Sequence, residues 1–196
     1  LKRYRMSLSV IEAIYFIYIF LALYILSLFV LIYTRSRNVL FYYPKGRAEP
    51  VSIVMPCYNE AEHIGKAIES LLELDYPKNM IEIIVVDDKS KDNSVEVIKK
   101  YTKKYKNVRL IVNKRNSGGA AEPTNIGVKA AKYDYVAVAD SDSTPDKDAL
   151  IKMIGFLQND KEVGGVTCAI MATHSNNFIE SLQAVEYSVI DFTRKL

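Results

Sequence analysis

The chain has 196 residues, of which 49% are hydrophobic and 25% are charged, and this predicts one main globular domain. Its net charge of +3 is too small to indicate a nucleic-acid-binding protein. The two cysteines, Cys57 and Cys168, lie far apart, and the two histidines, His63 and His174, are isolated. We therefore expect reduced, buried thiols and no zinc site.

The first predicted element is an apolar helix. Residues 13–34 carry no charged side chain, and as a helix they would span about 33 Å, enough to cross a bilayer core of about 30 Å. We expect residues 1–34 to form a transmembrane helix with a basic flank, in preference to a buried core helix or a cleaved signal peptide. Basic residues on both sides favour a cytosolic C-terminal side only slightly. They are Lys2, Arg3, Arg5, Arg35, Arg37, Lys45 and Arg47.

Residues 35–50 are polar and basic, and we expect a linker there. Short apolar runs then alternate with helical patterns, which predicts an α/β domain over residues 51–170, with a mostly parallel sheet covered by helices. The predicted strands are 51–55, 81–86, 108–112 and 135–139, with 163–168 as a candidate fifth. The predicted helices are 60–74, 93–105, 123–131 and 147–157.

The last part, residues 171–196, contains a predicted amphipathic helix at 177–195. Its apolar side chains recur at steps of three and four residues, as on one face of a helix. Two alternatives remain for this helix: it packs on the domain, or it lies in the membrane interface. The apolar positions are Phe178, Leu182, Val185, Val189 and Phe192.

Polar residues follow the first predicted strand. Asn59 is a suitable N-cap for the next helix, and Glu62 would complete a capping box. That explains Asn59 without a function. It leaves Tyr58 free to stack on a flat ring at the carboxyl edge of the sheet.

Two adjacent acids, Asp87 and Asp88, follow the second predicted strand. Neighbouring side chains of an extended chain point to opposite sides, so one acid would be structural and the other would face a ligand. Ser90 or Asp92 can cap the next helix.

After the third predicted strand come Gly118 and Gly119, and then Asn125 in the sequence TNIG. Paired glycines ahead of a helix allow a backbone to approach an anion closely. A plain turn is the alternative.

Asp140 and Asp142 follow the fourth predicted strand. Side chains two residues apart in an extended chain point the same way, so both carboxylates would leave the strand end about one cation apart. Such oxygen ligands suit Mg²⁺ or Mn²⁺ shared with a substrate phosphate. The alternative is a loop whose acids cap the next helix, for which Thr144 and Pro145 are the expected N-cap and first helical residue.

Together, these four strand ends supply a stacking ring, acids, a glycine turn and a cation site at one edge of the sheet, a combination typical of a nucleotide-diphosphate pocket. The order PCYNE, VVDDKSKD, NSGG…TNIG and ADSDSTP resembles glycosyltransferase family 2 with the GT-A fold, over roughly residues 51–170. The late QAVEY is similar to a stretch of the membrane-bound synthases of cellulose, chitin, hyaluronan and poly-N-acetylglucosamine.

The resemblance implies a role for each matching residue. Tyr58 and Glu60 would hold the nucleobase and ribose, and Asp88 the edge of the base. Asp140 would lie near the ribose and diphosphate, and Asp142 would be the chief ligand of Mg²⁺ or Mn²⁺.

The implied enzyme is a membrane-anchored, inverting glycosyltransferase that uses a nucleotide sugar, most often a UDP-sugar. Its partners would be the lipid bilayer and a glycan or lipid acceptor, with no nucleic acid. The catalytic domain would lie in the cytoplasm, at the cell membrane.

The sequence departs from the family pattern at two points. Ala120 stands where the family usually has a lysine. The family's catalytic base and its later Gln-x-x-Arg-Trp motif are absent, so we expect a truncated chain and a base beyond Leu196. The only acids after Glu162 are Glu180, Glu186 and Asp191, and they resemble ordinary helix residues. Two alternatives therefore remain, a catalytically incomplete nucleotide-sugar-binding module and a structural partner subunit.

Overall fold

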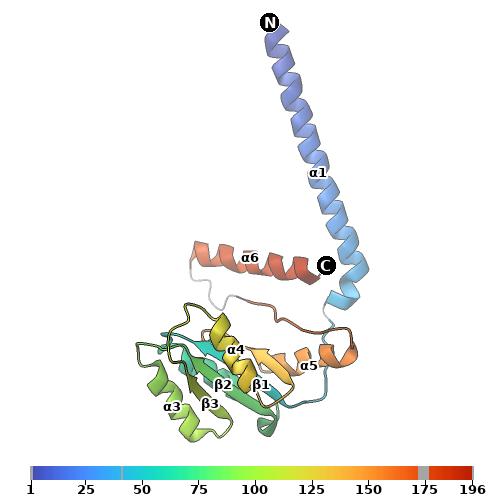
Figure 1. The fold of residues 1–196 in the computed structure, drawn as a ribbon. Helices are drawn as coiled ribbons and strands as arrows, with labels where there is room; N and C mark the ends of the chain where they lie inside the picture. Colours follow the sequence, from blue (N-terminus) through green and yellow to red (C-terminus); the bar gives the residue numbers. More distant parts are fainter. Residues whose placement is uncertain (1, 41, 172–176, 196) are drawn as a thin grey trace. The chain divides into compact units, whose positions relative to one another are not determined.

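The computed structural model describes residues 2–40, 42–171 and 177–195 (Figure 1). The chain divides into two compact units. One is Tyr43–Cys168, and the other combines Leu1–Tyr42 with Ala169–Leu196. The two units are described separately. His174 lies outside the described residues.

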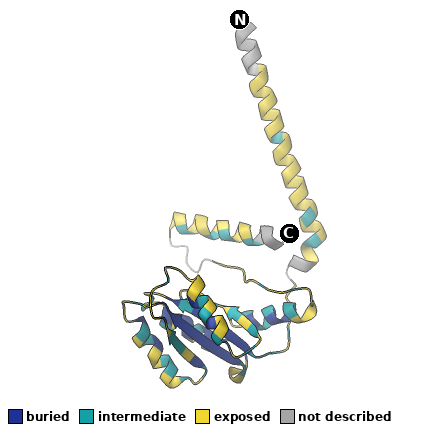
Figure 2. Ribbon diagram, in the orientation of Figure 1, coloured by how far each residue is buried: buried dark blue, intermediate teal, exposed yellow. Residues whose placement is uncertain are grey.

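Helix α1 spans Lys2–Leu40. Its Ser9–Asn38 portion is long and apolar enough to cross a membrane, and its most apolar stretch is not buried by the rest of the chain (Figure 2). The helix continues through Arg35 and Arg37, into the segment expected to be linker. Pro44 is the first proline in the sequence, so nothing in this segment breaks the helix earlier by removing a backbone donor.

Four parallel strands form one sheet in the order β3-β2-β1-β4. The strands are β1 (Val51–Cys57), β2 (Ile81–Asp87), β3 (Val108–Val112) and β4 (Tyr135–Val138). Every residue of β2 is buried, because helices cover both faces of the central strands. The parallel α/β fold predicted from the sequence is confirmed.

Helices cover the two faces unequally. The helices are α2 (Ile64–Leu72), α3 (Ser94–Lys104), α4 (Ala121–Ala130) and α5 (Ala149–Asn159), with a short 3₁₀ helix η1 at Lys78–Met80. The main core joins buried residues of α2, α3 and α5 to one face of the sheet. The other face packs against α4, which crosses β1 and β2 (Figure 1). A Cβ at Gly127 of α4 would collide with the side chain of Val54, so glycine permits this close crossing.

Residues 43–50 form a strap along α5 instead of a free linker. Pro44 is buried, and the N–H of Gly46 donates to the carbonyl of Ile151 at 3.3 Å. A Cβ at Gly155 would collide with the carbonyl of Pro44. The strap ends where the Tyr76 hydroxyl donates to the carbonyl of Glu49 at 2.8 Å.

Three expectations outside the candidate site are wrong. Residues 163–168 form no strand, since Gly164 and Gly165 weaken the run and no neighbouring strand pairs with it. Cys168 is exposed, not buried. Helix α5 begins at Ala149 after Asp148, so Thr144 and Pro145 precede the helix without capping it.

Helix α6 spans Phe178–Lys195, as the periodicity predicts. Leu182 and Val185 are exposed by 53% and 60%, so the described part of the apolar stripe remains open. The side chain of Phe192 lies outside the described residues.

Candidate functional site at the carboxyl edge of the sheet

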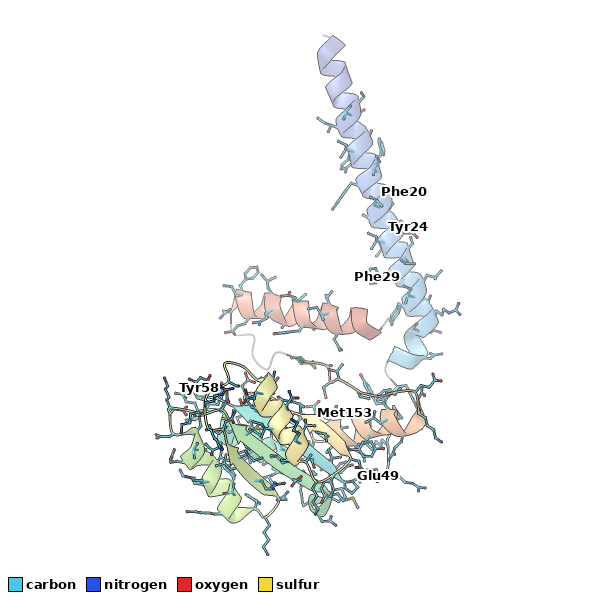
Figure 3. All side chains as sticks on the ribbon, in the orientation of Figure 1. Phe20, Tyr24, Phe29, Glu49, Tyr58 and Met153 are labelled. Carbon is cyan, nitrogen blue, oxygen red and sulfur yellow. The ribbon has the colours of Figure 1, made fainter. Side chains whose placement is uncertain are left out.

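The predicted site residues follow the carboxyl ends of the parallel strands, apart from Asn125, which lies inside α4. Parallel strands end at a common edge, so the four loops after β1 to β4 share one side of the domain. Chain order runs outward from β1 through β2 to β3, whereas β4 lies on the other flank of β1. Ligands bind at such a reversal of strand order. Tyr58 after β1 and Asp140 after β4 therefore flank the expected crevice. In Figure 3, Tyr58 and Glu49 mark the two ends of β1.

Asn59 is not a helix cap. Helix α2 begins only at Ile64, and Asn59 has φ of 56°, a left-handed conformation that asparagine tolerates better than most residues. Its N–H donates to Ser90 Oγ at 2.9 Å, and its Oδ1 accepts from the N–H of Lys91 at 2.7 Å. This turn leaves the neighbouring Tyr58 side chain 42% exposed, available for stacking.

Asp92 of the loop after β2 and Ser94, the first residue of α3, also hold the loop after β1. The N–H of Glu60 donates to Ser94 Oγ at 2.9 Å, and the N–H of Ala61 donates to Asp92 Oδ2 at 3.0 Å. Asp92 also accepts from the N–H of Ser94 at 3.0 Å. The N-cap of α3 is Asn93, so neither Ser90 nor Asp92 is the cap that the sequence suggested. Asp92 instead binds the backbone N–H groups of Ser94 and Ala61.

Asp87 and Asp88 are both buried, at 0% and 3% exposure. Asp87 Oδ2 accepts from the N–H of Ser90 at 3.1 Å, while its Oδ1 is the one buried side-chain N or O atom without a hydrogen bond in the described part of the chain. Asp87 pairs across the sheet with Cys57, and burial, followed by the nearby Asp87 charge, raises the pKa of Cys57 to about 12.

Asp88 accepts hydrogen bonds from the loop after β3. Asn113 Nδ2 donates to Oδ1 at 2.8 Å, and the N–H and Oγ of Ser117 donate to Oδ2 at 2.8 and 2.7 Å. Burial raises the pKa of Asp88, but these hydrogen bonds together outweigh burial and leave the pKa below its ordinary value. Asp88 is therefore an ionised carboxylate.

The glycine pair forms an open turn before α4. Gly118 has φ of +83°, and a Cβ at Gly118 or Gly119 would meet no atom within 4 Å. The turn therefore leaves room for a ligand beside its backbone. Asn125 is exposed within α4, one turn after the start of the helix.

Asp140 and Asp142 are exposed in the loop after β4. Ser143 Oγ lies 3.4 Å from Asp142 Oδ1, so both carboxylates keep lone pairs for a cation. Among the described residues, no group of three or more His, Cys, Asp or Glu side chains could hold a metal. Two free carboxylates fit Mg²⁺ or Mn²⁺, which complete their shell with water and substrate phosphates.

Sequence reasoning missed Asn113, Ser117 and Ser94. Each of the three forms a hydrogen bond with a residue at least 25 positions away in the chain. A polar residue directly after an apolar strand, as Asn113 is after Val112, was the available signal.

The structure is a parallel α/β domain in which the loops after the four strands share one edge of the sheet. The glycosyl transferase family 2 sequence model matches residues 52–194. The chain belongs to glycosyltransferase family 2.

Two relatives illustrate the match. A poly(ribitol-phosphate) beta-glucosyltransferase of Bacillus spizizenii is 42% identical over 106 residues, which is 54% of this chain and 17% of the relative. A poly-beta-1,6-N-acetyl-D-glucosamine synthase of Staphylococcus epidermidis is 34% identical over 146 residues, which is 74% of this chain and 34% of the relative. The chain therefore spans at most about a third of either relative.

Two solved structures share the fold, which is of the GT-A type. S. aureus TarS 1-349 in complex with UDP-GlcNAc is 29% identical, with a TM-score of 0.53, over 63% of this chain and 38% of that one. The mannosyltransferase PcManGT from Pyrobaculum calidifontis, in complex with GDP-Man and Mn2+, is 26% identical, with a TM-score of 0.58, over 73% and 43%.

Proposed function

We propose that this chain is the donor-binding part of a membrane-anchored, inverting glycosyltransferase that uses a UDP-sugar. The observation that carries the proposal is the common edge of the parallel sheet, which joins the Tyr58 ring, the glycine turn and the Asp140–Asp142 pair. These groups match a nucleobase, a diphosphate and its cation. TarS with UDP-GlcNAc supports a UDP-sugar, and PcManGT with GDP-Man and Mn2+ supports a metal.

In this proposal each residue binds one part of the donor. Tyr58 stacks on the base, and Glu60 and Asp140 hold the ribose, with Asp140 also near the diphosphate. Asp88 faces the edge of the base, and the open backbone at Gly118 and Gly119 approaches the phosphates, with Asn125 one helical turn further on. Asp142 is the chief metal ligand.

A bound Mg²⁺ or Mn²⁺ supplies positive charge that stabilises the leaving diphosphate. The residues of the edge contribute orientation, because they fix the nucleotide on a rigid sheet before the sugar reacts. A general base must take the proton of the acceptor hydroxyl. The proposal gives this role to none of the described acids at the edge.

The proposed setting is the cell membrane, with α1 in the bilayer and the sheet domain in the cytoplasm, where nucleotide sugars are made. The acceptor would be a growing glycan or a lipid. The polysaccharide synthase among the relatives supports a glycan.

Calorimetry on the detergent-solubilised chain tests the donor site. We expect UDP to bind with Mn²⁺, and Asp142→Asn to weaken this binding by at least about 10-fold, as the loss of a metal ligand does. Asp146→Asn is the matched control, because Asp146 is an exposed acid four positions further along the same loop. If UDP does not bind, or if both variants weaken it equally, the proposal is wrong. Release of sugar from the donor would separate an active transferase from a binding module.

A further inference from the structure

The carboxylate of Asp88 is surrounded by donors from a single loop. Asn113 donates to Oδ1, and the N–H of Ser117 donates to Oδ2. The Ser117 hydroxyl lies 2.7 Å from Oδ2 and 3.0 Å from the carbonyl of Gly119, and its single proton favours the nearer, charged oxygen. Asn116 Nδ2 donates to the backbone carbonyl of Asp88 at 3.2 Å instead. Oδ2 therefore has both acceptor positions filled, while Oδ1 keeps one.

An ionised carboxylate accepts hydrogen bonds and donates none. The free position on Oδ1 can therefore receive an N–H or O–H group, and a lone pair placed there would be repelled. Because Asp88 is only 3% exposed, water could not easily screen that repulsion.

Uracil and cytosine differ at ring atom N3, on the edge of the base that would face Asp88. Uracil carries a hydrogen on N3, whereas N3 of neutral cytosine is an acceptor. A carboxylate facing N3 would therefore bind uracil and reject cytosine, by a contact that is favourable for one base and unfavourable for the other.

We propose that Asn113 and Ser117 are positioning residues that hold Asp88 as an obligate acceptor, and that they thereby make the site select uracil over cytosine. This inference rests on the proposed function, in which Asp88 faces the edge of the base. Without these donors, burial would raise the pKa of the Asp88 carboxyl and make its neutral form easier to reach. A neutral carboxyl has an O–H, which could donate to N3 of cytosine, and the selection would weaken.

The test compares UDP with CDP, which share the ribose, the diphosphate and the metal. Affinities of both are measured by calorimetry with Mn²⁺ on the detergent-solubilised full chain. We expect the wild type to bind UDP at least about 100-fold more tightly than CDP, as sites built to hydrogen-bond one group discriminate strongly. Asn113→Ala and Ser117→Ala should each reduce this ratio by at least about 10-fold.

Two further variants separate positioning from general damage to the loop. Ser117→Thr keeps the hydroxyl and should retain most of the selectivity. Asn116→Ala removes a donor of the same loop that does not reach the Asp88 carboxylate, so it should leave the ratio unchanged even if both affinities fall. Circular dichroism confirms that each variant is folded.

The outcomes are distinguishable. If UDP binds and both alanine variants keep the wild-type ratio, the inference is wrong and the proposed function stands. If Asn116→Ala lowers the ratio as much as Asn113→Ala, the effect is a loosened loop and the inference is also wrong. If the wild type binds neither nucleotide, the proposed function fails, and the inference fails with it.

Discussion

Asn59 Oδ1 accepts a hydrogen bond from the backbone N–H of Lys91 at 2.7 Å, and this contact joins the loop after β1 to the loop after β2. The same Asn59 has φ of 56°. One residue thus supplies both an unusual backbone turn and a link between two loops of the proposed nucleotide site.

Substitutions at Asn59 should separate these two contributions. Asn59→Gly keeps the left-handed turn and loses the hydrogen bond, which should cost about 1 kcal/mol of unfolding free energy. Asn59→Ala also adds a steric cost of about 1–2 kcal/mol for the left-handed backbone. Thermal unfolding should therefore rank wild type above glycine and glycine above alanine. Equal losses in the two variants would show that the backbone conformation does not matter.

Ala120→Lys should strengthen the binding of UDP. Ala120 is exposed and directly precedes α4, beside the open glycine turn, so a lysine there has room to reach a phosphate. A direct charge-assisted contact would contribute about 1–2 kcal/mol. Calorimetry measures the change, and Ala120→Gln controls for chain length without charge. Equal affinities for the lysine and glutamine variants would reject this placement.

Glu82 should contribute stability that depends on pH. It accepts from Arg109 Nη1 at 2.6 Å, from Ser52 Oγ at 2.8 Å and from the N–H of Lys132 at 3.0 Å. Burial raises the pKa of Glu82, but these partners together lower it below the ordinary value of 4.5. A lowered folded pKa means that the stabilisation is present above pH 4.5 and is lost as the pH falls through the folded pKa.

Glu82→Gln should therefore be less stable than wild type at pH 7, by about 1–2 kcal/mol for the lost charge-assisted bonds. The difference should shrink as the pH falls below 4.5. Melting temperatures of both proteins at pH 7, 5 and 4 provide the measurement. Glu96→Gln is the control, because Glu96 is an exposed acid of α3. A difference that does not change with pH would contradict the ionised partner.

The two thiols should differ in reactivity. Cys57 is 2% exposed and its pKa is raised to about 12, so hardly any thiolate forms at pH 8. Cys168 is exposed, although burial of its thiol and the Asp146 charge raise its pKa as well. Iodoacetamide should therefore label Cys168 slowly and leave Cys57 intact. Mass spectrometry of digested, labelled protein shows the sites, and denatured protein should carry both labels. Labelling of folded Cys57 would indicate an open core.

The sequence was sufficient for the sheet because β1, β2 and β3 are apolar runs bounded by polar residues. It was insufficient for the loops. Asn59 has the local pattern of a helix cap, but its partner Lys91 lies 32 positions away, and no local rule detects such a contact. Residues 163–168 have strand-like composition, but a strand also needs a neighbour, and composition does not reveal one. The Asp140–Asp142 pair is recognisable from its spacing alone, and its role as a cation site stays a prediction.

Strand β4 lies at the border of the sheet, and no strand of the described residues pairs with its outer side. Val136 and Val138 are 39% and 55% exposed there. An edge strand presents unpaired backbone N–H and C=O groups beside an apolar surface, and these groups can pair with the edge strand of another molecule. Preparations of this polypeptide by itself should accordingly form reversible clusters whose size grows with concentration.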